Sequence, residues 1–298
     1  MPFSSGAYFG LDTISLENTH PNAIKNCRIC RSPVKVLHPF KKGFSIYHCQ
    51  KCNTDLMYPI PTFKDIESST DSAYFEAFND PSVRNFKVLD LERALSYIQP
   101  ADVRSYLDVG CAKGFLVGHL LKQKIDAYGI ELFSDIAKQA QDMVGRNRII
   151  NDGFETYSFN KKFDLITMFD FIEHVKDPSQ TLKKAKSILT PSGTILIITP
   201  NIDSWKRRVF KQYWTAYHIE HIHCFSGKSM ELLAKKAGLQ YLKFIPFQKT
   251  VNLHYFVRQL GHKFAFLAFS RILTKIKYIN FNFKISDDSM LVVLKNEK

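Results

Sequence analysis

Two hydrophobic periods alternate along the chain from about residue 104 onward. Short apolar runs such as SYLDVG (105–110) and DAYGIEL (126–132) are each followed by a segment in which apolar residues recur every three to four positions. The first pattern is typical of a buried strand and the second of an amphipathic helix. Strands that alternate with helices form a parallel sheet covered on both faces. We therefore expect an open α/β sheet.

The same patterns place the remaining elements. The predicted strands are 105–110, 126–132, 148–150, 163–170, 193–200, 242–247 and 289–295, and the predicted helices are 83–98, 114–123, 133–144, 178–189 and 227–239. Gly238 is expected to end the last of these helices, because glycine readily adopts the left-handed conformation of a helix C-terminus.

Four of the six cysteines form two pairs ahead of this region. Cys27, Cys30, Cys49 and Cys52 give a C-x2-C-x18-C-x2-C pattern. This spacing is typical of a four-thiolate zinc site, in which each pair occupies one tight turn. Disulfides are the alternative, although a cytosolic compartment disfavours them. A closed four-cysteine site has no open coordination position, so the predicted zinc is structural.

The other two cysteines, Cys111 and Cys224, are expected to be small buried residues rather than nucleophiles. The expected parts of the chain are a tail at 1–25, a zinc ribbon at 26–62, a linker with a helical lead-in at 63–103 and the α/β domain at 104–298.

Composition and charge restrict the class of protein further. The chain has 298 residues, 45% of them apolar, with a formal net charge of +13. It contains no apolar run of the length that spans a membrane and no visible secretory signal, so we expect a cytoplasmic protein. The positive charge favours anionic partners such as nucleic acid, anionic lipid or phosphorylated small molecules, unless it reflects only a lysine-rich proteome.

The loop after the first strand of the α/β domain has the composition of a ligand-binding turn. In LDVGCAKGFL, Gly110, Ala112 and Gly114 keep side chains small where the backbone turns, and the following helix presents free N–H groups. The loop lacks the G-x-G-x-x-G fingerprint, which argues against a nicotinamide or flavin enzyme.

Acidic residues follow the strands at the same predicted edge. Glu131 ends the second strand, where a carboxylate can bind both hydroxyls of a ribose, and Asp152 follows the third strand, where it can accept from an adenine amino group. Asp108 lies at the end of the first strand, near any cationic group of the ligand. Taken singly, each acid could equally be a solvated or helix-capping residue. Together they predict a site for an adenosine with a cationic amino-acid tail, which is S-adenosylmethionine. Asp170, after the fourth strand, is assigned to the same site, although a structural role stays open.

Four stretches of sequence carry a family resemblance. The segments LDVGCAKG, GIEL, FDLITMFDFIEHVKDP and GTILIITPN resemble the class I S-adenosylmethionine-dependent methyltransferases, and among them the ubiquinone O-methyltransferase-like branch, with its Glu-His-Val signature after the fourth strand. The resemblance implies a Rossmann-like seven-stranded sheet that ends in an antiparallel hairpin. It also implies that Asp108, Gly110 and Gly114 form the first motif, that Glu131 is the ribose acid and that Asp152 is the adenine acid. Ala112 stands where glycine is commoner. The cysteine-paired ribbon is similar to that of bacterial methyltransferases of sugar and secondary metabolism.

The segment YHIEHIHCFSG (217–227) is the candidate for catalytic chemistry. It belongs to a stretch at 201–227 that follows the fifth strand and is expected to cover the site as an active-site roof. Methyl transfer to a weakly acidic nucleophile requires removal of a proton. We interpret His221 as the base, with Glu220 and His174 as further catalytic candidates, while purely structural roles stay open. A metal at His218, His221 and His223 is disfavoured because the sequence shows no matching ligand cluster elsewhere.

Part of this segment resembles sugar C-methyltransferases, which carry a Tyr-His-Glu-His string followed by Phe-Ser. Glu220, His221, Phe225 and Ser226 align with that string, and an isoleucine at position 219 displaces the preceding tyrosine and histidine by one position.

The acceptor and partners are less sharply defined. Arg207, Arg208 and Lys211 could bind a phosphate or form a solvated basic turn. A basic amphipathic insertion is expected at 249–288, where it could lie on an anionic membrane or pack on its own domain. The leading hypothesis is O- or C-methylation of a small-molecule acceptor, such as a sugar nucleotide, lipid intermediate or secondary metabolite. The alternatives are an RNA methyltransferase and a non-catalytic module that binds the donor.

Overall fold

The computed structural model describes residues 24–40, 43–62, 64–66, 81–98, 103–252 and 282–296. Nearly all of the predicted tail at 1–25 and the centre of the predicted insertion, 253–281, lie outside these ranges.

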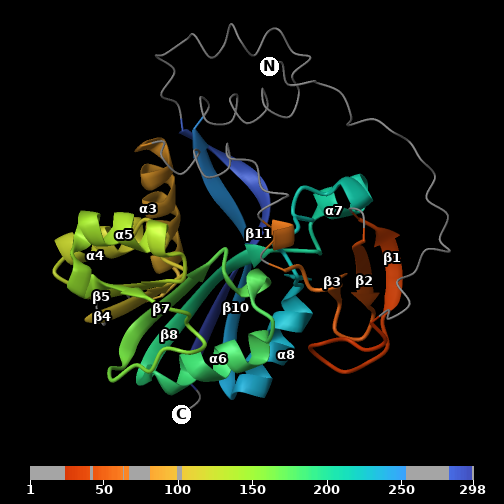
Figure 1. Cartoon of the computed structure of the whole chain (residues 1–298), viewed down its shortest axis with the longest axis horizontal. Coiled ribbons are helices and arrows are strands. Elements are labelled where there is room, and N and C mark those ends of the chain that lie inside the picture. Colours follow the sequence, from red (N-terminus) through yellow and green to blue (C-terminus); the bar gives the residue numbers. More distant parts are fainter. Residues whose placement is uncertain are drawn as a thin grey trace, which may run out of the picture.

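A seven-stranded mixed sheet forms the larger part of the molecule (Figure 1). Its strands are β4 (Ser105–Val109), β5 (Asp126–Glu131), β6 (Ile149–Asn151), β7 (Phe163–Phe169), β8 (Leu189–Pro200), β10 (Leu239–Asn252) and β11 (Asn282–Asn296), in the order β10-β11-β8-β7-β4-β5-β6. β11 pairs antiparallel with both of its neighbours, whereas β4 to β8 pair in parallel. The predicted fold class is confirmed, and so is the antiparallel final hairpin.

Helices cover both faces of this sheet because its strands alternate apolar residues between the faces. Ile195 and Ile197 of β8 belong to the hydrophobic cluster that contains α6 (Pro178–Ser187) and α8 (Gly227–Ala237). Leu196 and Ile198 belong to the opposite cluster. That second cluster contains α3 (Pro81–Leu95), α4 (Phe115–Lys122) and α5 (Ser134–Val144). As predicted, Gly238 caps α8 with a left-handed φ of 68°.

The order of the strands reverses beside β4. The chain runs from β4 outward through β5 and β6, and then returns to place β7 on the other side of β4. The carboxyl ends of β4 and β7 therefore flank the switch point, where ligands bind in open α/β sheets.

The final hairpin is longer than the sheet that it completes. β11 pairs with β8 only between Ser289 and Lys295, while its pairing with β10 continues to Asn252 and Asn282. The two strands project beyond the sheet as a two-stranded antiparallel extension (Figure 1). The described ends of the predicted 249–288 insertion, 249–252 and 282–288, are thus extended strands, and its centre lies outside the described residues.

A second, four-stranded sheet contains the cysteine-rich segment. Its strands are β1 (Lys35–Pro39), β2 (Ser45–Cys49), β3 (Thr54–Tyr58) and β9 (His223–Cys224), paired antiparallel in that order. The fourth strand comes from the predicted roof, about 165 residues away in sequence from β3. The cysteine end of this sheet also shares a hydrophobic cluster with β4 and α8 through Cys49, Leu56 and Phe225.

None of the helices in the described part of the chain is long and apolar enough to cross a membrane.

Candidate functional site

The loop after β4 has an alternating left-handed backbone. Gly110, Ala112 and Gly114 have φ values of 73°, 45° and 71°. Small residues in this conformation let the backbone turn tightly and allow a ligand to approach it closely. The N–H groups of Gly110 and Cys111 both donate to the carbonyl of Ile130, at 2.9 and 3.1 Å, and hold the loop against β5. A Cβ added at Gly110 would lie 2.8 Å from the ring of Phe171, so the glycine is required by a close contact as well as by its φ.

Glu131 is fixed by the same loop. Its Oε2 accepts from the N–H of Ala112 at 3.0 Å and its Oε1 from the N–H of Phe133 at 3.0 Å. Burial raises the pKa of this carboxyl, and the backbone N–H groups of Phe133 and Ala112 oppose that rise. A carboxylate oxygen accepts more than one hydrogen bond, so both oxygens keep capacity for the two hydroxyls of a ribose. The next residues, Leu132 and Phe133, are exposed large apolar side chains.

Asp108 is buried at the end of β4. Thr167 Oγ1 donates to its Oδ1 at 2.7 Å, and the hydroxyl of Tyr106 lies 2.6 Å from Thr167 Oγ1. Burial raises the pKa of Asp108 to about 7, against the opposing effects of Thr167 and of Lys87 on α3. A cationic group that entered this pocket would favour the ionised carboxylate.

The other two predicted donor acids have partners within the protein. Asp152 follows β6 and is exposed, and its Oδ1 accepts from the N–H of Gly153 at 2.6 Å and from Thr156 Oγ1 at 3.1 Å. Asp170 binds two lysines, Lys87 at 2.7 Å and Lys249 at 2.8 Å. Burial alone would raise the pKa of Asp170, but Lys249 and Lys87 hold it below its ordinary value. Sequence reasoning missed both lysines because, along the chain, they look like ordinary helix and strand surface residues.

The residues present fit S-adenosylmethionine. Asp108 and Glu131 lie at the carboxyl ends of β4 and β5, and Asp152 follows β6. These three strands are adjacent and parallel, so the three acids lie at the same edge of the sheet. The left-handed loop and Glu131 supply the tight backbone turn and the carboxylate that an adenosine ligand requires.

The segment after β8 forms a short helix followed by a 3-10 turn. α7 (Trp205–Phe210) begins at the cap residue Ser204, and η4 (Lys211–Tyr213) follows it. Of the three predicted phosphate-binding residues, Arg208 and Lys211 are exposed, whereas Arg207 is turned inward and ion-paired with Asp55. Trp205, Val209, Phe210 and Tyr213 leave large apolar surfaces exposed on the same segment.

His174 and His221 come together although they are far apart in sequence. His174 belongs to η3 (Ile172–His174), and the centroids of the two rings lie 4.9 Å apart. Nδ1 of His174 donates to the carbonyl of Glu220 at 2.9 Å, and Nδ1 of His221 donates to the carbonyl of Ala216 at 2.8 Å. Because a carbonyl only accepts, the proton of each neutral ring is on Nδ1 and the lone pair on Nε2. Burial, and next the neighbouring His174, lowers the pKa of His221 well below its ordinary value, so this ring is neutral at pH 7.

Glu173 completes a cluster with these histidines. It is fully buried, and its Oε2 accepts from Thr199 Oγ1 at 3.0 Å, while its Oε1 has no hydrogen-bond partner among the described residues. Glu173, His174 and His221 each offer one ligand atom within 4.8 Å of the others. Of the three histidines at which the sequence disfavours a metal, His218, His221 and His223, His221 alone belongs to this cluster of described residues, and Glu173 and His174 come from another part of the sequence. The cluster can accept a proton or hold a divalent cation.

The other two histidines of segment 217–227, His218 and His223, are not members of this cluster. His223 is in β9, stacked on Phe225 at a centroid distance of 5.7 Å, and burial lowers its pKa to about 3. His218 lies 5.9 Å from His221 between ring centroids. Glu220, which is also predicted to be catalytic, accepts a hydrogen bond from His174 through its backbone carbonyl.

The four paired cysteines meet at one point. Cys27 Sγ lies 3.5 Å from Cys52 Sγ, Cys30 Sγ lies 3.4 Å from Cys49 Sγ, and all four sulfurs are within 4.8 Å of one another. Tetrahedral zinc with Zn–S bonds of about 2.3 Å places its sulfurs about 3.8 Å apart. A disulfide needs about 2.05 Å, so the observed distances fit a metal site better.

Both turns that carry these cysteines have the same form. The residues that follow them, Arg31 and Asn53, have φ values of 64° and 54°, and their N–H groups donate to the carbonyls of Cys27 and Cys49. The other two cysteines are buried as predicted, Cys111 at 5% and Cys224 at 2% exposure.

Comparison with known proteins agrees with this geometry. The fold and the site define the class of proteins with an S-adenosylmethionine-binding methyltransferase sheet. The methyltransferase domain family matches residues 84–243, which is more than half of the chain, and the chain belongs to that family.

Curated relatives cover a part of the chain. The ubiquinone biosynthesis O-methyltransferase of Actinobacillus pleuropneumoniae serotype 7 is 31% identical over 108 residues, which are 33% of this chain and 46% of that protein. The mitochondrial ubiquinone biosynthesis O-methyltransferase of Candida albicans is 26% identical over 160 residues, which are 48% of this chain and 49% of that protein. The chain thus spans about half the length of the curated relatives that it matches.

Solved structures share the fold at low identity. The plantazolicin methyltransferase BpumL, crystallised with a desmethylPZN analogue and SAH, superposes with a TM-score of 0.52 at 17% identity, covering 79% of this chain and 93% of that one. A SAM-dependent methyltransferase from Archaeoglobus fulgidus gives a TM-score of 0.52 at 15% identity, covering 76% of this chain and 100% of that one.

The raised pKa of Asp108 predicts a pH-dependent donor affinity. S-adenosylmethionine brings a cationic amino group, which pairs with the ionised form of Asp108. Below a pKa of about 7 the carboxyl must therefore lose its proton when the donor binds. The dissociation constant should rise by up to about tenfold for each pH unit below 7 and stay level above it. Calorimetric titrations over about pH 5.5–8.5 measure this.

Two variants control this prediction. Asp108→Asn should bind the donor weakly and without the pH dependence. Asp126→Asn, which changes an acid at the opposite end of β5 that pairs with Arg148 and Lys161, should keep it. An affinity of the native protein that does not change with pH would contradict the assignment of Asp108.

Proposed function

We propose that the protein transfers a methyl group from S-adenosylmethionine to an oxygen or carbon atom of a small-molecule acceptor. The observation that carries the proposal is the pair of Nδ1-protonated imidazoles, His174 and His221, beside the donor loop. Phe171 packs on Gly110 of that loop, and His174 follows it by three residues. The relatives named as ubiquinone biosynthesis O-methyltransferases support O-methylation of a small molecule.

The chain supplies alignment and proton removal. When bound, S-adenosylmethionine supplies the electrophilic methyl group. Glu131 and the left-handed loop hold its adenosine, and Asp108 holds its charged tail. Nε2 of His221, neutral at pH 7, accepts the proton of the acceptor hydroxyl or carbon acid. The segment 201–227 covers this place and limits the access of water.

The charge of the covering segment favours an anionic acceptor. Residues 204–219 contain no aspartate or glutamate, and Arg208 and Lys211 are exposed there beside several aromatic side chains. A sugar nucleotide or another phosphorylated metabolite matches this combination of positive charge and aromatic surface.

Labelled donor tests the proposal directly. The purified protein is incubated with methyl-labelled S-adenosylmethionine and a cell extract, and the label is separated into small-molecule and RNA fractions. Label in small molecules is the expected result. Label in RNase-sensitive material would favour an RNA methyltransferase, and donor binding without any transfer would favour a non-catalytic module.

We also propose that the four-cysteine cluster binds one structural zinc ion. A thiol hydrogen bond from Cys52 lowers the pKa of Cys27 to about 5, so a thiolate, which is the form that binds a metal, is present at neutral pH. Four thiolates leave no open position, and the zinc would therefore stabilise the ribbon rather than activate a ligand.

His221→Ala should lower turnover by at least about tenfold, because the variant removes the group that accepts the proton. The donor dissociation constant should stay unchanged, because the described ring contacts of His221 go to Ala216, His174 and His218, which are not assigned to the donor. The matched control is His119→Ala, which removes a histidine on α4 that pairs with Glu92. Steady-state rates and calorimetry on the three proteins measure both quantities. Turnover equal to that of the native protein would exclude His221 as the base.

A divalent cation is the second candidate for the same cluster, favoured by the unpartnered Oε1 of Glu173. Protein freed of weakly bound metal by EDTA should keep its turnover if His221 acts as a base. Activity that is lost in EDTA and restored by a divalent cation would assign the cluster to metal binding instead.

Elemental analysis checks the zinc site. Protein purified without chelator should contain about one zinc per chain. Cys52→Ser should lose the metal and lower the midpoint of thermal unfolding, because metal binding contributes to the folding free energy. Cys111→Ser, which changes a buried cysteine outside the cluster, should keep the zinc. A content far below one in the native protein would contradict the site.

A further inference from the structure

We propose that the ribbon (residues 26–62) is part of the acceptor side of the site, and that Asp55 of the ribbon is the positioning residue that sets the covering segment 201–227 over it. The role in catalysis rests on the proposed function, whereas the effect on the covering segment does not.

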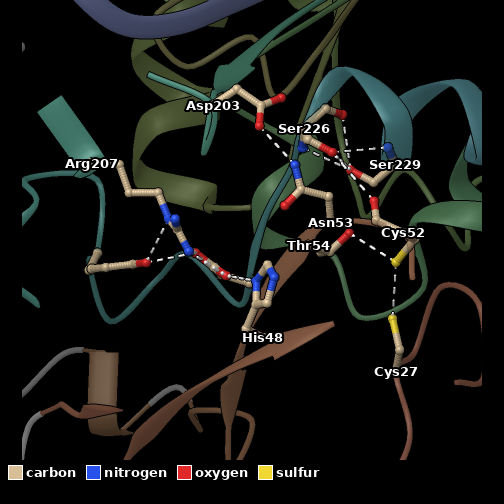
Figure 2. A network of polar contacts seen from close by, with 11 residues as sticks. Cys27, His48, Cys52, Asn53, Thr54, Asp203, Arg207, Ser226 and Ser229 are labelled. Atoms are coloured by element: carbon tan, nitrogen blue, oxygen red, sulfur yellow. Dashed lines mark hydrogen bonds and ion pairs between the residues drawn. The ribbon is translucent and has the colours of Figure 1, made fainter. Parts of the chain in front are cut away.

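Asp55 is the centre of a buried polar network between the ribbon and the covering segment. It is 1% exposed and lies on β3, where it pairs with Cys224 of β9. Arg207 donates to it through Nε at 2.8 Å and Nη2 at 3.0 Å, which is the bidentate geometry of a strong, directional ion pair. The hydroxyl of Tyr217 donates at 2.6 Å, and Nδ1 of His48 lies at 2.7 Å. Figure 2 shows Arg207 and His48 meeting in this network.

Two of these partners, Arg207 and Tyr217, belong to the covering segment. Arg207 is in α7 near its start, and Tyr217 comes directly before the histidines. A single carboxylate from the ribbon therefore fixes two points of the segment ten residues apart in sequence. Burial and the neighbouring Asp55 raise the pKa of Tyr217, so its hydroxyl stays protonated and continues to donate.

The turn of the second cysteine pair fixes the two ends of the same segment. Asn53 Nδ2 donates to Asp203 Oδ1 at 2.8 Å, ahead of α7. Ser226 Oγ, the cap of α8, lies 3.4 Å from the carbonyl of Cys52. Both contacts lie close together in Figure 2 beside the cysteines.

The turn of the first cysteine pair fixes the strand pairing. Arg28 donates to the carbonyl of Met57 at 2.8 Å and to that of Ile222 at 3.4 Å, and the N–H of Met57 donates to the carbonyl of Ile222 at 3.1 Å. β9 is only two residues long, so it depends on such contacts for its place at the edge of the sheet.

The covering segment in turn orients the histidine cluster. The carbonyl of Glu220 fixes the ring of His174, and the carbonyl of Ala216 fixes that of His221. In the sequence, Tyr217 directly follows Ala216 and precedes Glu220. A displaced Tyr217 would therefore move both carbonyls, and with them the two Nε2 atoms that face the acceptor.

The donor side does not depend on this network. Within the described part of the chain, Asp108, Ala112 and Glu131 form their hydrogen bonds with residues between 106 and 167 and not with the ribbon. A substitution of Asp55 should therefore impair use of the acceptor and leave the affinity for the donor unchanged.

The test compares Asp55→Asn with the matched control Asp126→Asn. Asparagine keeps the shape of the side chain but removes the charge that pairs with Arg207. Asp126 is also an ion-paired aspartate, but it lies at the amino end of β5, away from both sites. Hydrogen exchange of backbone amides is followed by mass spectrometry in the zinc-loaded full chain without acceptor, and the donor dissociation constant is measured by calorimetry.

In Asp55→Asn, exchange in 203–226 should be at least about tenfold faster, while exchange in 104–170 and the donor dissociation constant stay as in the control. Zinc content should remain about one per chain, which shows that the effect does not come from loss of the metal. Once a reactive acceptor is known, Asp55→Asn should raise the KM for that acceptor and lower kcat. The ratio kcat/KM should fall by about tenfold or more. If Asp55 only stabilised the fold, the variant would not keep its donor affinity while its activity toward the acceptor falls.

Tyr217→Phe provides a milder variant, because it removes one hydrogen bond to Asp55 and keeps the ion pair. It should give a smaller change in the same segment, and the double variant should show less than the sum of the two effects, since both act through one contact.

Unchanged exchange in 203–226 for both variants would overturn the proposal, and so would equal loss of donor and acceptor binding. If no acceptor is methylated by the native protein, the proposed function fails, but the exchange measurement still decides whether Asp55 positions the segment.

Discussion

Parallel pairing of β4 with both β5 and β7 is the constraint on which the donor site depends. Strands that run in one direction end at one edge, so residues far apart in sequence, such as Asp108 and Thr167, meet there. Asp108 and Glu131 occupy the ends of neighbouring strands, and the loop between β4 and α4 joins them through the N–H of Ala112. A Cβ at Gly110 of that loop would collide with the ring of Phe171.

The proposed acceptor side has a different origin. It is built from loop and turn segments rather than from strand ends, and loops need external contacts to keep one conformation. Here the contacts come from the ribbon: a two-residue strand pairs with β3, and a buried carboxylate binds Arg207 and Tyr217. The ribbon is thus joined to the methyltransferase domain by hydrogen bonds, ion pairs and a shared hydrophobic cluster, whereas the sequence suggested two successive units.

The electrostatics of the two sides also differ. Burial leaves the donor carboxyl Asp108 with a raised pKa until a cation arrives, while Lys87 and Lys249 neutralise Asp170 within the protein. In the proposed function, burial keeps His221 neutral, which suits a group that must accept a proton. The exposed Arg208 and Lys211 of the covering segment would then attract an anionic acceptor.

The sequence by itself determined the α/β class, the order of strands and helices and the grouping of the four cysteines, because these follow from local periodicity and from the spacing of the two cysteine pairs. The donor acids and His221 follow from the sequence as predictions, since acids at strand ends and a cluster of histidines are visible in one dimension. Only the tertiary structure brought Glu173 and His174 to His221, turned Arg207 inward, paired Asp170 with two lysines and added β9 to the ribbon. Each of these depends on contacts between residues that are distant in the chain, and neither composition nor periodicity records which side chains of a folded protein become neighbours.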